Sequence, residues 1–188
     1  LVDRELLKEM KKAGCYMISF GVESGSQKIL NNLRKKISLN QAERAFKMSH
    51  DAGIQTVGYF MIGSPGERHT TIRQTIDFAK KLDANFAQFS VTTPFPGTDL
   101  YDLYLNSMNK NIEWDDFIYA NLRSSSTPVF ETASLSREDL REWNARAYKE
   151  FYFRLSYIWK RFIGMRSIGD LKTNIKGFLM FLDMVRGK

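Results

Sequence analysis

Three strand-like runs of apolar residues, each followed by a helical pattern, constrain the fold of this chain more than any other feature. The runs cover residues 16–22, 56–62 and 86–92, and each gives way to a glycine-containing or polar turn. Nearly continuous apolar runs are typical of strands that are buried on both faces of a parallel sheet. Three such units within about ninety residues predict consecutive β/α units joined by right-handed crossovers. We therefore expect an α/β fold whose three strands are adjacent and parallel in chain order.

Helix signals lie between these runs. A short helix is expected to begin after the N-cap residue Asp3 and to end at Gly14. Ser38 and Gln41 form a capping box at the start of a second helix. The helices at 39–52 and 67–82 are expected to pack on one face of the sheet, and another helix is expected near residues 100–105.

The composition changes after residue 116, where a serine-rich stretch precedes helical sequence. We predict two parts, a β/α part at residues 1–123 and C-terminal helices at 124–188. One long aromatic helix is expected from Ser136 to about Phe162, with a shorter amphipathic helix at 171–185. The apolar face of the long helix should pack on the sheet through Trp143, Ala147, Phe151 and Leu155.

Size and cysteine content limit the class of protein. The 188 residues are 43% hydrophobic, which is enough for a packed core, and Cys15 is the only cysteine. One cysteine excludes an internal disulfide and any cluster site built from this chain alone, and it favours a reducing cytoplasm. The longest apolar run near the C-terminal end, residues 178–182, is too short to cross a bilayer.

Positive charge is concentrated in the last quarter of the chain. The net charge is +7, and residues 137–188 carry 12 basic and 6 acidic side chains. Such asymmetry is typical of a patch for an acidic partner or for a membrane surface, and also of a solvated helical face. Both interpretations stay open at the level of sequence.

Polar and glycine residues follow the predicted strands, where ligands of parallel α/β proteins gather. Gly21 allows close backbone approach, and Glu23 could bind hydroxyl groups such as those of a ribose. The turn at 63–67 contains two glycines and a proline, and its amides could face a ligand. Glu23 could instead be a solvated loop residue, and Glu67 could simply complement the dipole of the next helix.

In order, the segments at 20–25, 58–67 and 93–98 resemble the radical S-adenosylmethionine (SAM) superfamily. The combination G-V-E-S-G, G-x-P-G-E and P-x-P-G-T is most similar to its cobalamin-dependent branch. That branch includes anaerobic magnesium-protoporphyrin IX monomethyl ester oxidative cyclases and certain methyltransferases. The resemblance implies a partial barrel of six β/α units, in which the strands of this chain correspond to the fourth, fifth and sixth.

The resemblance also implies cofactors and a set of contact residues. SAM and a 4Fe–4S cluster are expected in the longer protein, together with a small-molecule substrate, and resemblance to the cobalamin-dependent branch implies cobalamin as well. The cofactor-binding residues implied are Ser19, Gly21, Glu23, Ser24, Phe60, Ile62, Gly63, Glu67, Val91 and Thr92. No catalytic residue and no metal ligand is assigned to this chain.

The family's C-x-x-x-C-x-x-C loop, which holds the cluster, is absent from this sequence. We therefore expect an inactive piece of a larger enzyme whose N-terminal half of the barrel is missing, and Leu1 fits that expectation because it is not an initiator methionine. Two alternatives remain, a fragment of a tRNA-modifying radical SAM enzyme and a non-catalytic membrane-peripheral module. The helical tail argues against nucleic-acid binding, because the RNA-binding module of the tRNA enzymes is a small β-barrel.

Overall fold

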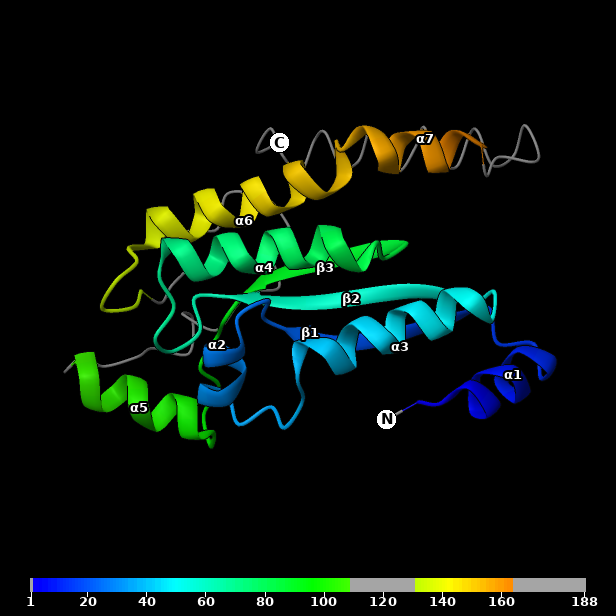
Figure 1. Ribbon diagram of the computed structural model, residues 1–188. Coiled ribbons are helices and arrows are strands. Elements are labelled where there is room, and N and C mark those ends of the chain that lie inside the picture. Colours follow the sequence, from blue (N-terminus) through cyan, green and yellow to red (C-terminus); the bar gives the residue numbers. More distant parts are fainter. Residues whose placement is uncertain (1, 109–130, 164–188) are drawn as a thin grey trace.

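The computed structural model describes residues 2–108 and 131–163 and contains one parallel sheet (Figure 1). Strands β1 (Met17–Glu23), β2 (Gln55–Ile62) and β3 (Phe86–Val91) follow one another in the order β1-β2-β3. Gly58 of β2 pairs with a residue of β1 on one side and of β3 on the other, and both pairings are parallel. The predicted strand order and direction are confirmed.

Helices α1 (Arg4–Lys12), α3 (Leu39–Asp51) and α4 (His69–Leu82) connect or precede these strands, and α5 (Asp99–Met108) follows β3. The predicted caps are present, because the Asp3 carboxylate accepts the Leu6 amide and Ser38 forms a capping box with Gln41. A further short helix, α2 (Gln27–Asn32), was not predicted. Six residues are too few to give a clear helical period.

The core lies between one face of the sheet and the helices α3, α4 and α6 (Arg137–Tyr152). Phe46 of α3, Phe60 of β2 and Phe151 of α6 are at most 1% exposed. The Phe60 ring stacks on Phe89 with 5.2 Å between ring centroids. The prediction that α3 and α4 cover the same face is confirmed.

The opposite face of the sheet is open in the described part of the chain. Each strand has exposed residues on this face. They are Ser19 and Gly21 of β1, Tyr59 of β2, and Gln88 and Ser90 of β3. The expectation that these strands are buried on both faces is therefore wrong for the described residues. The covering helices all lie on one side, as right-handed crossovers between adjacent parallel strands require.

The predicted long aromatic helix is two helices. α6 ends at Tyr152, and α7 (Leu155–Ile163) begins three residues later. Just beyond this end, the Arg154 guanidinium donates to the Phe151 carbonyl at 2.8 Å and lies 4.0 Å from the centre of the Phe151 ring. Because the break resets the helical phase, Leu155 is 84% exposed and the prediction that it packs on the sheet is wrong.

Other residues of the predicted face pack as expected. Ala147 and Phe151 are fully buried, and Trp143 packs against the same core as the sheet. The boundary expected at residues 123 and 124 and the helix expected at 171–185 lie outside the described residues. Among the described helices, none combines the length and the hydropathy needed to span a membrane.

Candidate functional site

The carboxyl ends of the three strands meet at one edge of the sheet, because the strands are parallel. β1 ends at Glu23, β2 at Ile62 and β3 at Val91. In α/β proteins this edge is where ligands bind, since loops and helix N-termini converge there. The residues predicted to bind the cofactor lie in these strands or directly after them.

Glu23 adopts an unusual backbone conformation at the end of β1. Its φ is 68°, in the left-handed region, and the β1–β2 register shifts between Gly21 and Glu23. Left-handed backbone costs a non-glycine residue about 1–3 kcal/mol and is frequent at binding sites. The Glu23 carboxylate accepts a hydrogen bond from Lys35 Nζ at 2.8 Å, and its side chain is 19% exposed. A carboxylate at the open face is thus held in place by a cation.

Glu67 has a different role from the one suggested by its position before α4. Its Oε2 atom accepts hydrogen bonds from the Gly63 amide at 2.6 Å and the Ser64 amide at 2.9 Å, so it closes its own turn instead of capping the helix. The residue is 1% exposed, and Oε1 has no hydrogen-bond partner among the described residues. Burial raises the pKa of Glu67 to about 7, against the opposing effect of the two amides.

Gly63 must be glycine at this turn. Its φ of 89° is in the region that L-residues rarely adopt, and an added Cβ would lie 3.0 Å from Leu140 Cδ2 of α6. The turn that ends β2 is therefore fixed both by Glu67 and by contact with the helical layer.

Ser24 and Thr92 are buried and engaged in the protein itself. The Ser24 hydroxyl lies 3.1 Å from the Thr75 hydroxyl of α4 and accepts the Ser26 amide. The Thr92 hydroxyl lies 3.2 Å from that of Ser64, and its amide donates to the Ile62 carbonyl at 2.7 Å. Ser24 thus ties the end of β1 to α4, and Thr92 ties the end of β3 to the end of β2.

The side chains of Phe60 and Ile62 point into the core, so these residues can offer a ligand only backbone atoms. Val91 is half-buried, whereas Ser19 and Gly21 lie exposed on the open face. The structure thus places Ser19, Gly21 and Glu23 along one side of β1 and directs the side chains of Phe60 and Ile62 away from them.

Tyr59 and Gln88 belong to the open face and were missed. The sheet register pairs Gly21 with Tyr59 and Tyr59 with Gln88, so the three form one row across the sheet. The two-residue period of strands could have identified them from the sequence. Lys35 was also missed, and no local signal marks it, because it reaches Glu23 from the segment that follows α2.

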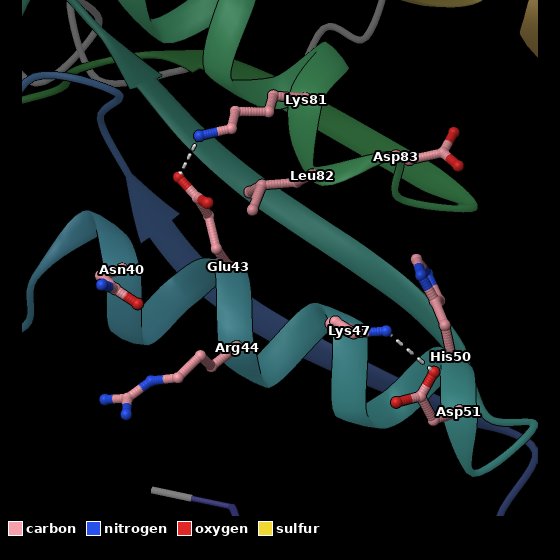
Figure 2. Close-up of a pocket in the computed structure, with 9 residues that line it drawn as sticks. All are labelled: Asn40, Glu43, Arg44, Lys47, His50, Asp51, Lys81, Leu82 and Asp83. Carbon is pink, nitrogen blue, oxygen red and sulfur yellow. Dashed lines mark hydrogen bonds and ion pairs between the residues drawn. The ribbon is translucent and has the colours of Figure 1, made fainter.

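A groove of about 410 Å³ lies on the other side of the molecule, between α3 and α4 (Figure 2). Ion pairs cross or border it, at 2.6 Å between Glu43 and Lys81 and at 3.5 Å between Lys47 and Asp51. His50 Nε2 is 2.9 Å from the Thr56 hydroxyl, and burial lowers its pKa. The groove belongs to the helical layer, and two pairs of its lining residues, Glu43 with Lys81 and Lys47 with Asp51, form ion pairs with each other.

The chain does not supply the ligands of an iron–sulfur cluster. Cys15, its single cysteine, is half-buried, and its thiol donates to the Met17 carbonyl at 3.4 Å. No group of three or more His, Cys, Asp or Glu residues within the described ranges is arranged to hold a metal ion. Any cluster at this site must take its thiolates from elsewhere.

Comparison with known proteins accounts for the strand-end motifs. Residues 1–79 match the family model described as the radical SAM superfamily. The chain belongs to the radical SAM superfamily. An uncharacterised methyltransferase of Pyrococcus horikoshii is 33% identical over 153 residues, which are 81% of this chain and 32% of that protein.

The anaerobic magnesium-protoporphyrin IX monomethyl ester cyclase of Rubrivivax gelatinosus is 27% identical over 158 residues, which are 84% of this chain and 27% of the cyclase. The chain therefore spans about a third of the length of these curated relatives. Among solved structures, the radical SAM methyltransferase TsrM from Kitasatospora setae, with cobalamin and a 4Fe–4S cluster bound, matches with a TM-score of 0.52. The match covers 56% of this chain and 21% of TsrM at 24% identity, and it supports the α/β fold.

Proposed function

We propose that this chain is the SAM-binding half of a radical SAM barrel that works within a longer enzyme. The observation that carries the proposal is the Glu23 carboxylate, held at the carboxyl edge of a sheet whose adjoining face is open. Membership of the superfamily and the share of its relatives that the chain spans support the same assignment.

In this proposal the cofactors are SAM, a 4Fe–4S cluster and, in line with the cobalamin-dependent branch, cobalamin. The cluster supplies the electron that cleaves SAM, and its thiolate ligands come from outside this chain. Glu23 would accept hydrogen bonds from the ribose hydroxyls of SAM, as a carboxylate at an open face can. The backbone from Phe60 to Gly63 would lie along the adenine, with Val91 and Thr92 at the pocket wall.

The reaction of the longer enzyme is proposed to be radical methylation or oxidative cyclisation of a small organic substrate. The names of the methyltransferase and cyclase relatives support these two classes. Location in a reducing cytoplasm is proposed from the single free cysteine.

The test of the SAM site uses the protein that carries this chain together with a cluster-binding segment. Glu23→Ala should weaken SAM binding by about 1.5–3 kcal/mol, because charge-assisted hydrogen bonds to the ribose are lost. Equilibrium dialysis under anaerobic conditions measures the affinity. Gln55→Ala is the matched control, since Gln55 is exposed on the same sheet face at its amino end. Unchanged SAM affinity in Glu23→Ala would contradict the proposed site.

We further propose that α7 brings the protein to anionic membrane surfaces. Leu155, Trp159 and Ile163 lie on one side of α7 and are 84%, 64% and 64% exposed. The segment from 137 to 188 has twice as many basic as acidic residues, which complements anionic lipid. Exposed apolar residues beside basic ones are typical of helices that lie in the membrane interface.

Co-sedimentation with vesicles tests this contact. Binding to anionic vesicles should exceed binding to neutral ones and should fall as salt rises, because salt screens surface charge. Trp159→Ser should reduce the binding, whereas Leu103→Ser, at a residue of α5 that is 59% exposed, should not. Equal and negligible binding to both kinds of vesicle would leave α7 as an ordinary solvated helix.

A further inference from the structure

The ion pair between Glu23 and Lys35 joins the end of β1 to the segment that follows α2. Lys35 lies after α2, and its amide donates to the Leu30 carbonyl at 2.9 Å, which fixes its backbone against the end of that helix. Its Nζ atom lies 2.8 Å from Glu23 Oε1. The Lys35 side chain is 36% exposed and that of Glu23 is 19% exposed, so the pair is partly shielded from water.

Gly21 provides the space for this pair. A Cβ atom at position 21 would lie 2.5 Å from Glu23 Oε1 and 3.0 Å from Lys35 Nζ. The φ of Gly21 is not in the left-handed region, so backbone strain does not explain the glycine. The missing side chain is what leaves room for the carboxylate and the ammonium group over Gly21.

The pair also constrains a carboxylate that the backbone alone would leave poorly defined. Glu23 follows the register shift in β1 and has a left-handed φ. A glutamate side chain has three rotatable bonds, and an exposed one loses conformational entropy when a ligand fixes it. The hydrogen bond from Lys35 restrains one carboxylate oxygen before any ligand arrives, and no described residue donates to the other oxygen.

We propose that Lys35 is a positioning residue for ligand binding, which holds Glu23 in the orientation that accepts ligand hydroxyls, and that Gly21 is required because the pair lies over it. The inference rests on the proposed role of Glu23. Because the Lys35 ammonium group neutralises the Glu23 charge, the paired site favours a neutral diol such as a ribose over a simple cation.

The test measures SAM affinity in the protein that carries this chain with its cluster-binding segment, using equilibrium dialysis. Lys35→Met should raise the Kd for SAM about tenfold, and Lys35→Arg should restore it to within about threefold, because arginine keeps the charged hydrogen bond. In a Glu23→Gln background, Lys35→Met should have little further effect. Gly21→Ala should also raise the Kd about tenfold, whereas Gln55→Ala should not change it.

Two outcomes would overturn the inference while leaving the proposed function intact. One is unchanged affinity in Lys35→Met together with weakened binding in Glu23→Gln. The other is an equal loss from Lys35→Met in both backgrounds, which would mean that Lys35 acts on SAM directly and not through Glu23. Unchanged affinity in Glu23→Gln itself would instead refute the proposed role of Glu23. Circular dichroism of each variant separates these results from a loss of folding.

Discussion

The outer edge of β3 and the carboxyl ends of the strands are built in opposite ways. Along β3 and just before it, tyrosine hydroxyls bond to four backbone groups that do not pair with β2. Tyr152 donates to the Ala87 carbonyl at 2.8 Å and accepts the Ala87 amide at 3.1 Å. Tyr148 accepts the Phe89 amide at 3.2 Å, and Tyr157 donates to the Asn85 carbonyl at 3.1 Å.

At the strand ends, by contrast, one buried polar atom has no described hydrogen-bond partner and one residue has a strained backbone. Glu67 keeps one carboxylate oxygen without a described partner, and Glu23 has a left-handed backbone. The outer edge of β3 is therefore covered by side chains that bond to its backbone, whereas the carboxyl ends of the strands keep a polar atom without a described partner. Side chains of α6 and α7 terminate the sheet at β3 as a further strand would, whereas the open face and strand ends have the features expected of a ligand site.

The largest expected effect is a loss of stability where α6 packs against β3. Phe151→Ala should lower the free energy of unfolding by about 3–5 kcal/mol, because it leaves a cavity under α6. The Phe151 side chain is fully buried, and its ring lies against Phe89 with 6.1 Å between centroids. Urea denaturation followed by circular dichroism measures the change. Leu103→Ala should cost less than about 0.5 kcal/mol, and equal losses in both variants would mean that α6 does not complete the core.

The next largest effect is expected at the strand ends, where Glu67 should make the free energy of unfolding depend on pH. The pKa of Glu67 is about 7 in the folded protein, above its ordinary value, so the folded state binds the proton more tightly than the unfolded state does. Protonated Glu67 therefore contributes about 3 kcal/mol to the free energy of unfolding. This contribution is fully present below about pH 4 and is lost as the pH rises through 7. Unfolding free energies between pH 4 and 8 measure it.

Glu67→Gln provides the matched variant, because its amide oxygen can still accept the Gly63 and Ser64 amides but does not titrate in this range. The decline of stability between pH 4 and 8 should be smaller in this variant by the same amount. An identical pH profile in both proteins would show that Glu67 does not titrate with a raised pKa.

A smaller loss is expected from single hydroxyls at the β3 edge. Tyr152→Phe should destabilise the protein by about 1–3 kcal/mol, because the Ala87 amide and carbonyl lose their partner on that side. Hydrogen exchange of the Ala87 amide should accelerate more than that of core amides in β2. Unchanged exchange at Ala87 would mean that the hydroxyl does not protect the edge.

The smallest effect is expected from the charged contacts that fasten α6 to α4. Glu150 of α6 receives hydrogen bonds from Arg73 and Lys80 of α4, at 2.6 and 3.1 Å. The Arg73 guanidinium is the main reason that the pKa of Glu150 is lowered to about 2. The contribution is present above about pH 4.5 and is lost as the pH falls toward 2.

Because these side chains are partly exposed, Glu150→Gln should cost at most about 1 kcal/mol at neutral pH. The cost should shrink in high salt and nearly vanish near pH 2. A loss that is independent of pH and salt would identify a packing role instead of an electrostatic one.

The sequence by itself determined the parts of this fold that depend on neighbouring residues. The three strands were visible as apolar runs, and the caps at Asp3 and Ser38 were visible because each cap joins residues three positions apart. The order and direction of the strands followed from crossover chirality. The motifs at the strand ends also identified the family, since they lie in contiguous segments.

Only the tertiary structure decided which groups complete the site and the sheet edge. Tyr148 and Tyr152 meet backbone atoms 59 and 65 positions away, and Lys35 meets Glu23 after the chain has passed through α2. The open face became visible only when all three covering helices proved to lie on the other side. Such contacts depend on how packed elements are placed relative to one another, and periodicity along the chain carries no information about that placement.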